Sequence, residues 1–219
     1  MSQQTKNSVI EAGAKFLSDP KILGRLPNDI QNGVANGSKE FAYAEYYFKK
    51  RFTAITGIID FIKETDTLTA GERNFDKGKL PTGVYMALTS VSFNYAFHAT
   101  SGGVGIEPGS QIFMNSAYTQ AVHTCVRNSE FTLKNGNRTV LECMTKTFLS
   151  DSSISYQGAN ANDEAGLVLP QPKLLLPESQ IRAYFQFPTS TLTATTDATN
   201  NHFGEIILKG VKIVDRVEK

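Results

Sequence analysis

The sequence has no tryptophan and only two cysteines, Cys125 and Cys143. Two isolated thiols do not make the disulfide framework of a small secreted domain, and they are typical of core residues in a reducing compartment. A charge excess is missing as well, since 22 Lys and Arg residues stand against 21 Asp and Glu residues. Proteins that neutralise several phosphates carry a concentrated basic excess, so we expect no sequence-specific nucleic-acid partner.

Long apolar runs are also missing. No stretch approaches the roughly 18 uncharged apolar residues that a membrane-spanning helix needs, so we expect no membrane span. Residues 1–7 are polar and differ from the start of a secretory signal, so we do not expect export by the general pathway.

Residue patterns that carry chemistry are scarce. His98, His123 and His202 lie far apart in the sequence and lack the His-x-His spacing of a cupin-type metal site. Neither a Gly-x-Ser-x-Gly nucleophile elbow nor a Walker-type phosphate loop is present. We therefore predict that the protein is not an enzyme and that it uses no metal or cofactor.

The first third of the chain, residues 1–70, has helical spacing. Ser8 and Glu11 form a capping-box pattern that predicts a short helix to about Leu17, and the glycines and prolines of residues 18–37 predict an irregular connection. From residue 38 the apolar residues recur at steps of three and four, which predicts an amphipathic helix over about residues 38–64. These positions are Phe41, Ala44, Phe48, Phe52, Ile55, Ile59 and Ile62.

An aromatic cluster on this segment is too wide for one buried helix face. It is a candidate subunit interface, and the alternative is that the helix packs on its own domain. The candidate interface residues are Tyr43, Tyr46, Tyr47, Phe48 and Phe52.

Residues 71–219 have the alternation and turn chemistry of strands. A long strand that bends or splits is predicted over 84–97, further strands over 111–115 and 118–126, and a hairpin at Asn135-Gly136 with Glu130 and Glu142 facing solvent. Strands are also predicted over 173–176, 181–187 and 203–214, with Pro170, Pro172, Pro177 and Pro188 at strand ends or sheet edges. About eight strands without helical crossovers predict an antiparallel β-sandwich or barrel, most naturally a jelly roll.

One long segment is almost without charge, because Glu107 is the only acidic or basic residue between Lys79 and Arg127. Surfaces that are buried against other protein are depleted of charge, since desolvating a charge is costly. The alternative is that this segment supplies buried central strands. The same composition thus predicts either an assembly surface or a core.

Three stretches carry a resemblance. They are the hairpin EFTLKNGNRTVLEC, the segment LPQPKLLLPESQIRAYFQFP and the final strand HFGEIILKGVKIV. With the entry through residues 74–81, this order resembles the jelly-roll capsid proteins of bacteriophages over residues 74–214. The resemblance implies a virion shell or shell-associated subunit that is assembled in the host cytoplasm as a homo-oligomer with other virion proteins.

Two alternatives remain beside this interpretation. A carbohydrate- or receptor-binding sandwich is favoured by Tyr85, Tyr95, Tyr118 and Tyr156 as stacking platforms, although the lack of tryptophan disfavours it. An enzyme on a jelly-roll scaffold is disfavoured by the missing metal spacing. Two parts are expected in either case, a helical segment over residues 1–70 and a β-sandwich domain over residues 71–219.

Overall fold

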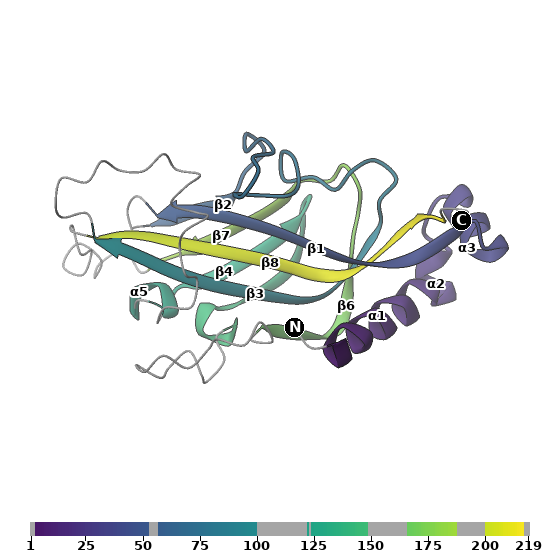
Figure 1. Ribbon diagram of the computed structural model, residues 1–219, viewed down its shortest axis with the longest axis horizontal. Helices are drawn as coiled ribbons and strands as arrows, with labels where there is room; N and C mark the ends of the chain where they lie inside the picture. Colours follow the sequence, from purple (N-terminus) through teal and green to yellow (C-terminus); the bar gives the residue numbers. More distant parts are fainter. Residues whose placement is uncertain are drawn as a thin grey trace.

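Eight strands form two antiparallel four-stranded sheets that face one another (Figure 1). The computed structural model describes residues 3–52, 57–99, 122, 124–148, 166–187 and 200–216. Sheet A has the strand order β1-β8-β3-β6, and sheet B has the order β2-β7-β4-β5. The strands are β1 (Lys39–Phe52), β2 (Ile58–Ile62), β3 (Met86–Ala99), β4 (Glu130–Asn135), β5 (Arg138–Met144), β6 (Leu167–Leu175), β7 (Ile181–Gln186) and β8 (Asn200–Asp215).

The strand pairing is nested. β1 pairs with β8, β2 with β7, β3 with β6 and β4 with β5, and every one of these pairs is antiparallel. Two further pairs, β3 with β8 and β4 with β7, complete the sheets. Consecutive strands therefore belong to different sheets, except β4 and β5, which form a hairpin in sheet B.

Aromatic side chains join the two sheets at the centre of the core. Phe93 of β3 lies 5.1 Å from Phe185 of β7 between ring centroids, and 6.4 Å from Phe61 of β2. Phe185 also packs against Phe61 at 5.5 Å and against Phe131 of β4 at 5.2 Å. All four rings are at most 4% exposed, so burial of these side chains is a main source of stability.

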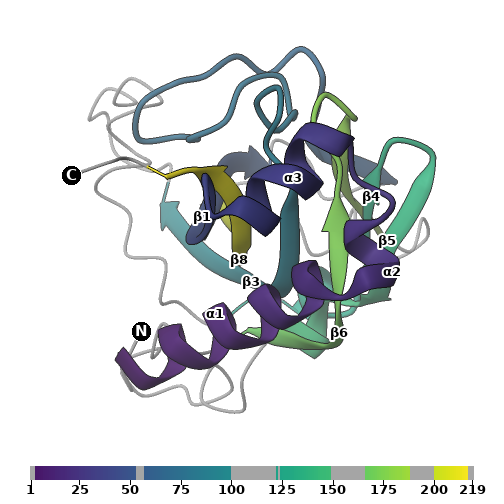
Figure 2. The ribbon, with the colours of Figure 1, turned by 90° about the vertical axis from the view of Figure 1, so that its right-hand side faces the viewer.

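Three helices cover one end of sheet A on the face that points away from sheet B (Figure 2). They are α1 (Gln3–Ser18), α2 (Pro20–Leu23) and α3 (Asn28–Asn36). α1 contacts all four strands of sheet A. Leu17, Leu26 and Ile30 pack there on Val211 and Ile213 of β8, in a second apolar cluster separate from the sandwich core.

The predicted helix over residues 38–64 is wrong, because this segment forms β1 and β2. Along β1, Ala44 and Phe48 face the sandwich core, whereas Phe41 faces the helices. A strand that is covered on both faces has apolar residues on both, and their combined spacing imitates a helical stripe. Residues 39–62 therefore contribute to both sheets, and a division at residue 70 separates β1 and β2 from the strands with which they pair.

The other helical expectations need smaller corrections. The first helix starts at Gln3 rather than at Ser8, although it ends close to the expected position. Residues 18–37 are more ordered than predicted, since they contain α2 and α3. Asp19 caps α2 by accepting a hydrogen bond from the backbone N–H of Lys21 (2.8 Å), and Gly37 ends the segment with a φ of 77°.

The strand expectations after residue 71 hold well in the part that the structure describes. β3 bends at a bulge between Leu88 and Ser90, which moves Met86 and Leu88 onto the core face together with Val91. The hairpin is present, but Gly136 and Asn137 form its turn, with Gly136 at a φ of 60°. β7 and β8 match the predictions over 181–187 and 203–214, whereas β6 begins at Leu167, earlier than the strand predicted over 173–176, and contains Pro170 and Pro172 as a strand at the sheet edge.

Two predicted strands fall partly or wholly outside this description. The strand over 111–115 lies outside the described residues, and the strand over 118–126 is described only near its end, where α5 (Thr124–Arg127) is a short helix. A short 3-10 helix, η1 (Thr145–Phe148), follows β5. The described residues nevertheless contain the predicted number of about eight strands, because β1 and β2 come from the segment that was expected to be helical.

Candidate functional site

The five aromatic residues predicted as an interface do not share one face of β1. Tyr46 and Phe48 point into the sandwich core and are 8% and 1% exposed, so they are not available to a neighbouring subunit. Tyr43 and Tyr47 lie on the opposite face and are half-buried. Phe52 is placed at the end of β1, opposite His202, and its side chain lies outside the description. The five residues therefore do not form one shared exposed surface, and Tyr43 and Tyr47 are the two that the structure describes on the outer face.

Tyr43 is held in place by its neighbour on the strand. Its hydroxyl donates a hydrogen bond to Oε2 of Glu45 at 2.8 Å. Burial of the ring, together with this bond and the charge of Glu45, raises the pKa of Tyr43 well above its ordinary value. The phenol therefore remains a neutral hydrogen-bond donor at physiological pH.

A segment of irregular chain, residues 63–80, which we call the edge strap, covers the outer edge of β1. The side chain of Asn74 accepts a hydrogen bond from Tyr47 N (2.8 Å) and donates one to Glu45 O (2.8 Å). Lys49 N donates to Glu72 O at 2.7 Å. The edge strap thus occupies backbone groups that would otherwise pair with a foreign strand.

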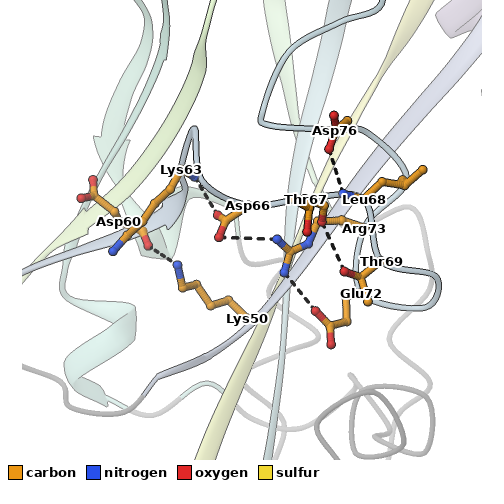
Figure 3. Close-up of polar contacts among 10 residues, drawn as sticks. All are labelled: Lys50, Asp60, Lys63, Asp66, Thr67, Leu68, Thr69, Glu72, Arg73 and Asp76. Carbon is orange, nitrogen blue, oxygen red and sulfur yellow. Dashed lines mark hydrogen bonds and ion pairs between the residues drawn. The ribbon is translucent and has the colours of Figure 1, made fainter.

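Arg73 anchors the edge strap to the core (Figure 3). Its guanidinium lies 4.5 Å from the centroid of the Phe48 ring, and Nη2 is 2.9 Å from Oε2 of Glu72. Nη1 is 3.4 Å from Asp66, whose other carboxylate oxygen accepts a hydrogen bond from Lys63 N. These contacts bring a cation–π interaction and two ion pairs together at one half-buried point.

Lys50 joins the same region to β2. Its Nζ donates a hydrogen bond to the carbonyl of Asp60 at 2.8 Å, as Figure 3 shows. Burial lowers the pKa of Lys50, with the positive charges of Lys63 and Arg73 adding to the effect and the nearby carboxylates opposing it. Because Lys50 meets a carbonyl of β2 and Arg73 meets two carboxylates, the cluster links β1 to β2 at the corner between the sheets.

The charge-poor segment is explained, over its described part, by burial. β3 lies between β8 and β6 in sheet A, and Leu88, Val91, Phe93 and Tyr95 are at most 4% exposed. A central strand covered on both faces excludes charged residues on energetic grounds. Residues 100–121 lie outside the description, so the assembly interpretation of that part stays a prediction.

The outer face of sheet A beyond the helices carries a polar ladder. Lys49 Nζ lies 3.7 Å from Oε1 of Glu205, and Asn94 Nδ2 donates to Oε2 of Glu205 at 2.9 Å. Lys49 also lies 5.6 Å from the ring centroid of Tyr47. The ladder ties β1, β8 and β3 together across the sheet.

The outer face of sheet B carries side chains of both charges around a tyrosine. β7 presents Arg182, Tyr184 and Gln186, and the register places Lys134, Thr132 and Glu130 of β4 opposite them. Lys134 Nζ lies 5.6 Å from the ring centroid of Tyr184, and Arg182 Nη2 lies 3.4 Å from Asp60 of β2. Glu130 and Glu142 are exposed on this side, as the sequence predicted.

Two exposed apolar side chains stand at the end of this face where Glu130 lies. Ile58 of β2 is 62% exposed and Met144 of β5 is 39% exposed. The register places Ile58 opposite Gln186, and Met144 opposite Glu130. The face therefore has one end with cations and another end with a carboxylate between apolar side chains. Sequence reasoning missed it, although residues 181–187 alternate between buried and polar positions in a way that predicts it.

The stacking platforms proposed for a carbohydrate are not assembled as expected. Tyr95 is 1% exposed in the core, and Tyr85 packs beside the helices. Tyr118 and Tyr156 lie outside the described residues. Among the tyrosines that the structure describes, Tyr184 instead stands on an open polar face.

The fold brings two of the three candidate histidines close together in sheet A. His98 of β3 pairs in register with Asn201 and His202 of β8 pairs with Phe97, so the two histidines lie one position apart, whereas His123 lies outside the description. Within the described ranges, no three His, Cys, Asp or Glu side chains gather as metal ligands would. Cys143 is half-buried on β5, where burial raises the pKa of its thiol to about 11. Over the same ranges, no helix is both long and apolar enough to cross a membrane.

Comparison of the chain with protein-family models, with curated proteins and with solved structures gives no match. A proposal about function therefore depends on the strand pairing, on the surfaces described above and on the sequence resemblance.

Proposed function

We propose that this chain is a jelly-roll subunit of a bacteriophage virion, either of the shell or associated with it, that self-assembles as a homo-oligomer. The nested pairing of β1 with β8, β2 with β7, β3 with β6 and β4 with β5 carries the fold part of this proposal. A jelly roll is an eight-stranded double sheet in which an antiparallel ribbon is rolled, and rolling such a ribbon produces this pairing. Jelly rolls serve as capsid subunits, lectins and cupins. The fold therefore limits the function to a few classes, and other observations must distinguish among these classes.

The sequence resemblance supports the capsid interpretation among these classes. The hairpin of β4 and β5 and the succession of β6, β7 and β8 are the stretches that carry it. In this proposal the protein is assembled in the host cytoplasm, resides in the virion, contacts other virion proteins and has no catalytic role.

The edges of sheet A favour association through sheet faces rather than through pairing of an edge strand with a strand of another subunit. The edge strap occupies backbone groups of β1, and Pro170 and Pro172 lie in the edge strand β6, where they lack N–H donors. Neither edge strand of sheet A is thus suited to pairing with a strand of a neighbouring subunit. Helices α1 to α3 pack on their own sheet A, so we propose that they contribute to assembly by shaping the subunit rather than as a free arm.

A second candidate function is a carbohydrate- or receptor-binding module. Tyr184 favours it, because a tyrosine ring beside Lys134 on an open polar face is suited to stacking against a sugar. Binding of the wild-type protein to a glycan array, with loss of that binding in Tyr184→Ala, would support this candidate.

Light scattering after size separation tests the assembly proposal. We expect the mass to exceed that of the 24.0 kDa chain and to rise with concentration, and we expect electron microscopy to reveal closed particles or discrete rings. A monomer from micromolar to millimolar concentration would refute the proposal. Glycan binding by such a monomer would favour the second candidate.

A further inference from the structure

We propose that the outer face of sheet B binds a second copy of this chain through a two-fold contact, in which Glu130 of each copy meets Lys134 of the other. The inference rests on the proposed function as a self-assembling subunit and names the surface that it would use.

The charge distribution along β4 carries this inference. Glu130, Thr132 and Lys134 alternate with the core residues Phe131 and Leu133, so all three side chains lie on the outer face. At about 3.4 Å per residue, the positions of the two opposite charges are roughly 14 Å apart along the strand. A strand with a carboxylate at one end and an ammonium at the other is complementary to an inverted copy of itself.

On the neighbouring strand β7, the positive charge lies at the same end of the face as on β4. Arg182 pairs in register with Lys134, and Gln186 pairs with Glu130, so the two cations share one end of the face. A two-fold axis across the strands at the level of Thr132 and Tyr184 exchanges the two ends. Glu130 then meets Lys134 of the second copy, and Gln186 meets Arg182 of the second copy.

The middle of the face suits the centre of such a contact. Tyr184 lies on the axis, where its ring meets that of the second copy, and tyrosines are enriched at the centres of protein interfaces. The exposed side chains of Ile58 and Met144 add apolar area at the ends that are exchanged. Two sheets packed face to face at about 10 Å would bring the two Tyr184 rings into contact and would place Ile58 and Met144 over the opposite end of the second copy.

The remaining charges of the face determine how much electrostatic repulsion the two-fold contact would contain. Asp60 is already paired with Arg182 at 3.4 Å, so its charge is compensated within the chain. Glu142 lies on the edge strand β5 opposite Thr132 and would approach Glu142 of the second copy at the rim, where water screens the repulsion. The face has carboxylates at one end and in its middle and cations at the other end, so it fits an inverted copy of itself better than a polyanion.

Charge exchange along β4 provides the test. The single variants Glu130→Lys and Lys134→Glu each replace two attractions of the symmetric contact by two repulsions. The double variant Glu130→Lys, Lys134→Glu restores both attractions in reverse. Matched controls are Glu11→Lys on α1 and Lys21→Glu on α2, which are exposed and lie on the other side of the molecule.

Sedimentation equilibrium measures the dissociation constant of each full-length variant, and circular dichroism checks that each one folds. We expect each single variant to weaken association about tenfold or more, the double variant to recover most of this loss, and both controls to resemble the wild type. Raising the salt from about 0.05 M to about 0.5 M should weaken association of the wild type, which requires no mutation.

If all three variants associate as tightly as the wild type, or if the double variant associates as weakly as the single variants, this contact is wrong. The proposed function as a self-assembling subunit would be unaffected by that result. Wild-type association that does not respond to salt would overturn it as well. A wild-type protein that stays monomeric at every concentration would overturn both the contact and the proposed function.

Discussion

The edge strap predicts a specific loss of stability when Asn74 is replaced. In Asn74→Ala, Tyr47 N loses its acceptor at 2.8 Å and Glu45 O loses its donor at 2.8 Å. Each hydrogen bond contributes about 0.5–1.5 kcal/mol net, but the edge of β1 is accessible to water, which replaces part of the loss. We therefore expect the free energy of unfolding to fall by about 1–2 kcal/mol.

Urea denaturation followed by circular dichroism measures this change. The midpoint should fall while the slope stays constant, and the melting temperature should drop by about 3–6 °C for a chain of this length. Asn74→Asp keeps an acceptor for Tyr47 N but places a carboxylate against Glu45 O in place of the donor. It should thus be no more stable than the alanine variant at neutral pH.

Asn32→Ala on α3 is the control, because Asn32 is exposed on a helix away from the strap, and its unfolding free energy should change by less than about 0.5 kcal/mol. If Asn74→Ala were as stable as the wild type, the side chain would contribute nothing to holding the strap on β1. The idea that the strap closes this edge would then lose its main support.

Three further predictions follow from packing and titration. A Cβ at Gly13 would lie 2.5 Å from Cγ2 of Val211, so Gly13→Ala should cost about 1–3 kcal/mol in urea denaturation, and adding Val211→Ala should recover part of that cost. Phe185→Ala should cost about 3–5 kcal/mol by the same measurement, because its ring packs on those of Phe61, Phe93, Phe131 and Phe187, and a loss below 1 kcal/mol would contradict the described core. In a Cys125→Ser background, Cys143 should react with iodoacetamide at pH 8 far more slowly in the folded than in the unfolded chain, since burial raises its thiol pKa from 9.0 to about 11. The raised pKa stabilises the fold fully below pH 9 and loses this contribution as the pH rises through 11, so thiol reactivity equal to that of the unfolded chain would contradict the assignment.

The sequence predicts the fold well where one face of a strand is buried and the other is solvated. β7 is the clear case, because Ile181, Ala183 and Phe185 alternate with polar residues and the strand lies as expected. β1 fails for the opposite reason, since sheet B covers one of its faces and the helices cover the first part of the other, around Phe41. Local periodicity cannot tell such a strand from a helix, and only the pairing with β8, far along the chain at Asn200–Asp215, distinguishes them.

The candidate surfaces were harder to predict for a related reason. The aromatic cluster of β1 combines Tyr46 of the core with Tyr43 of the outer face, because neighbours in a strand point in opposite directions. The face around Tyr184 joins residues of four strands, and it becomes visible only when the register of sheet B is known.

The nested pairing also prescribes an order in which the chain can fold. Two turn residues separate β4 from β5, whereas β3 and β6, β2 and β7, and finally β1 and β8 enclose successively longer stretches of chain. The entropy lost on closing a loop increases with its length, and folding slows as contacts become more distant in sequence. The hairpin is therefore the natural nucleus from which pairing spreads outward. On a ribosome, β1 leaves the exit tunnel long before β8, so until then a fourteen-residue strand rich in aromatic residues lacks the strand with which it pairs.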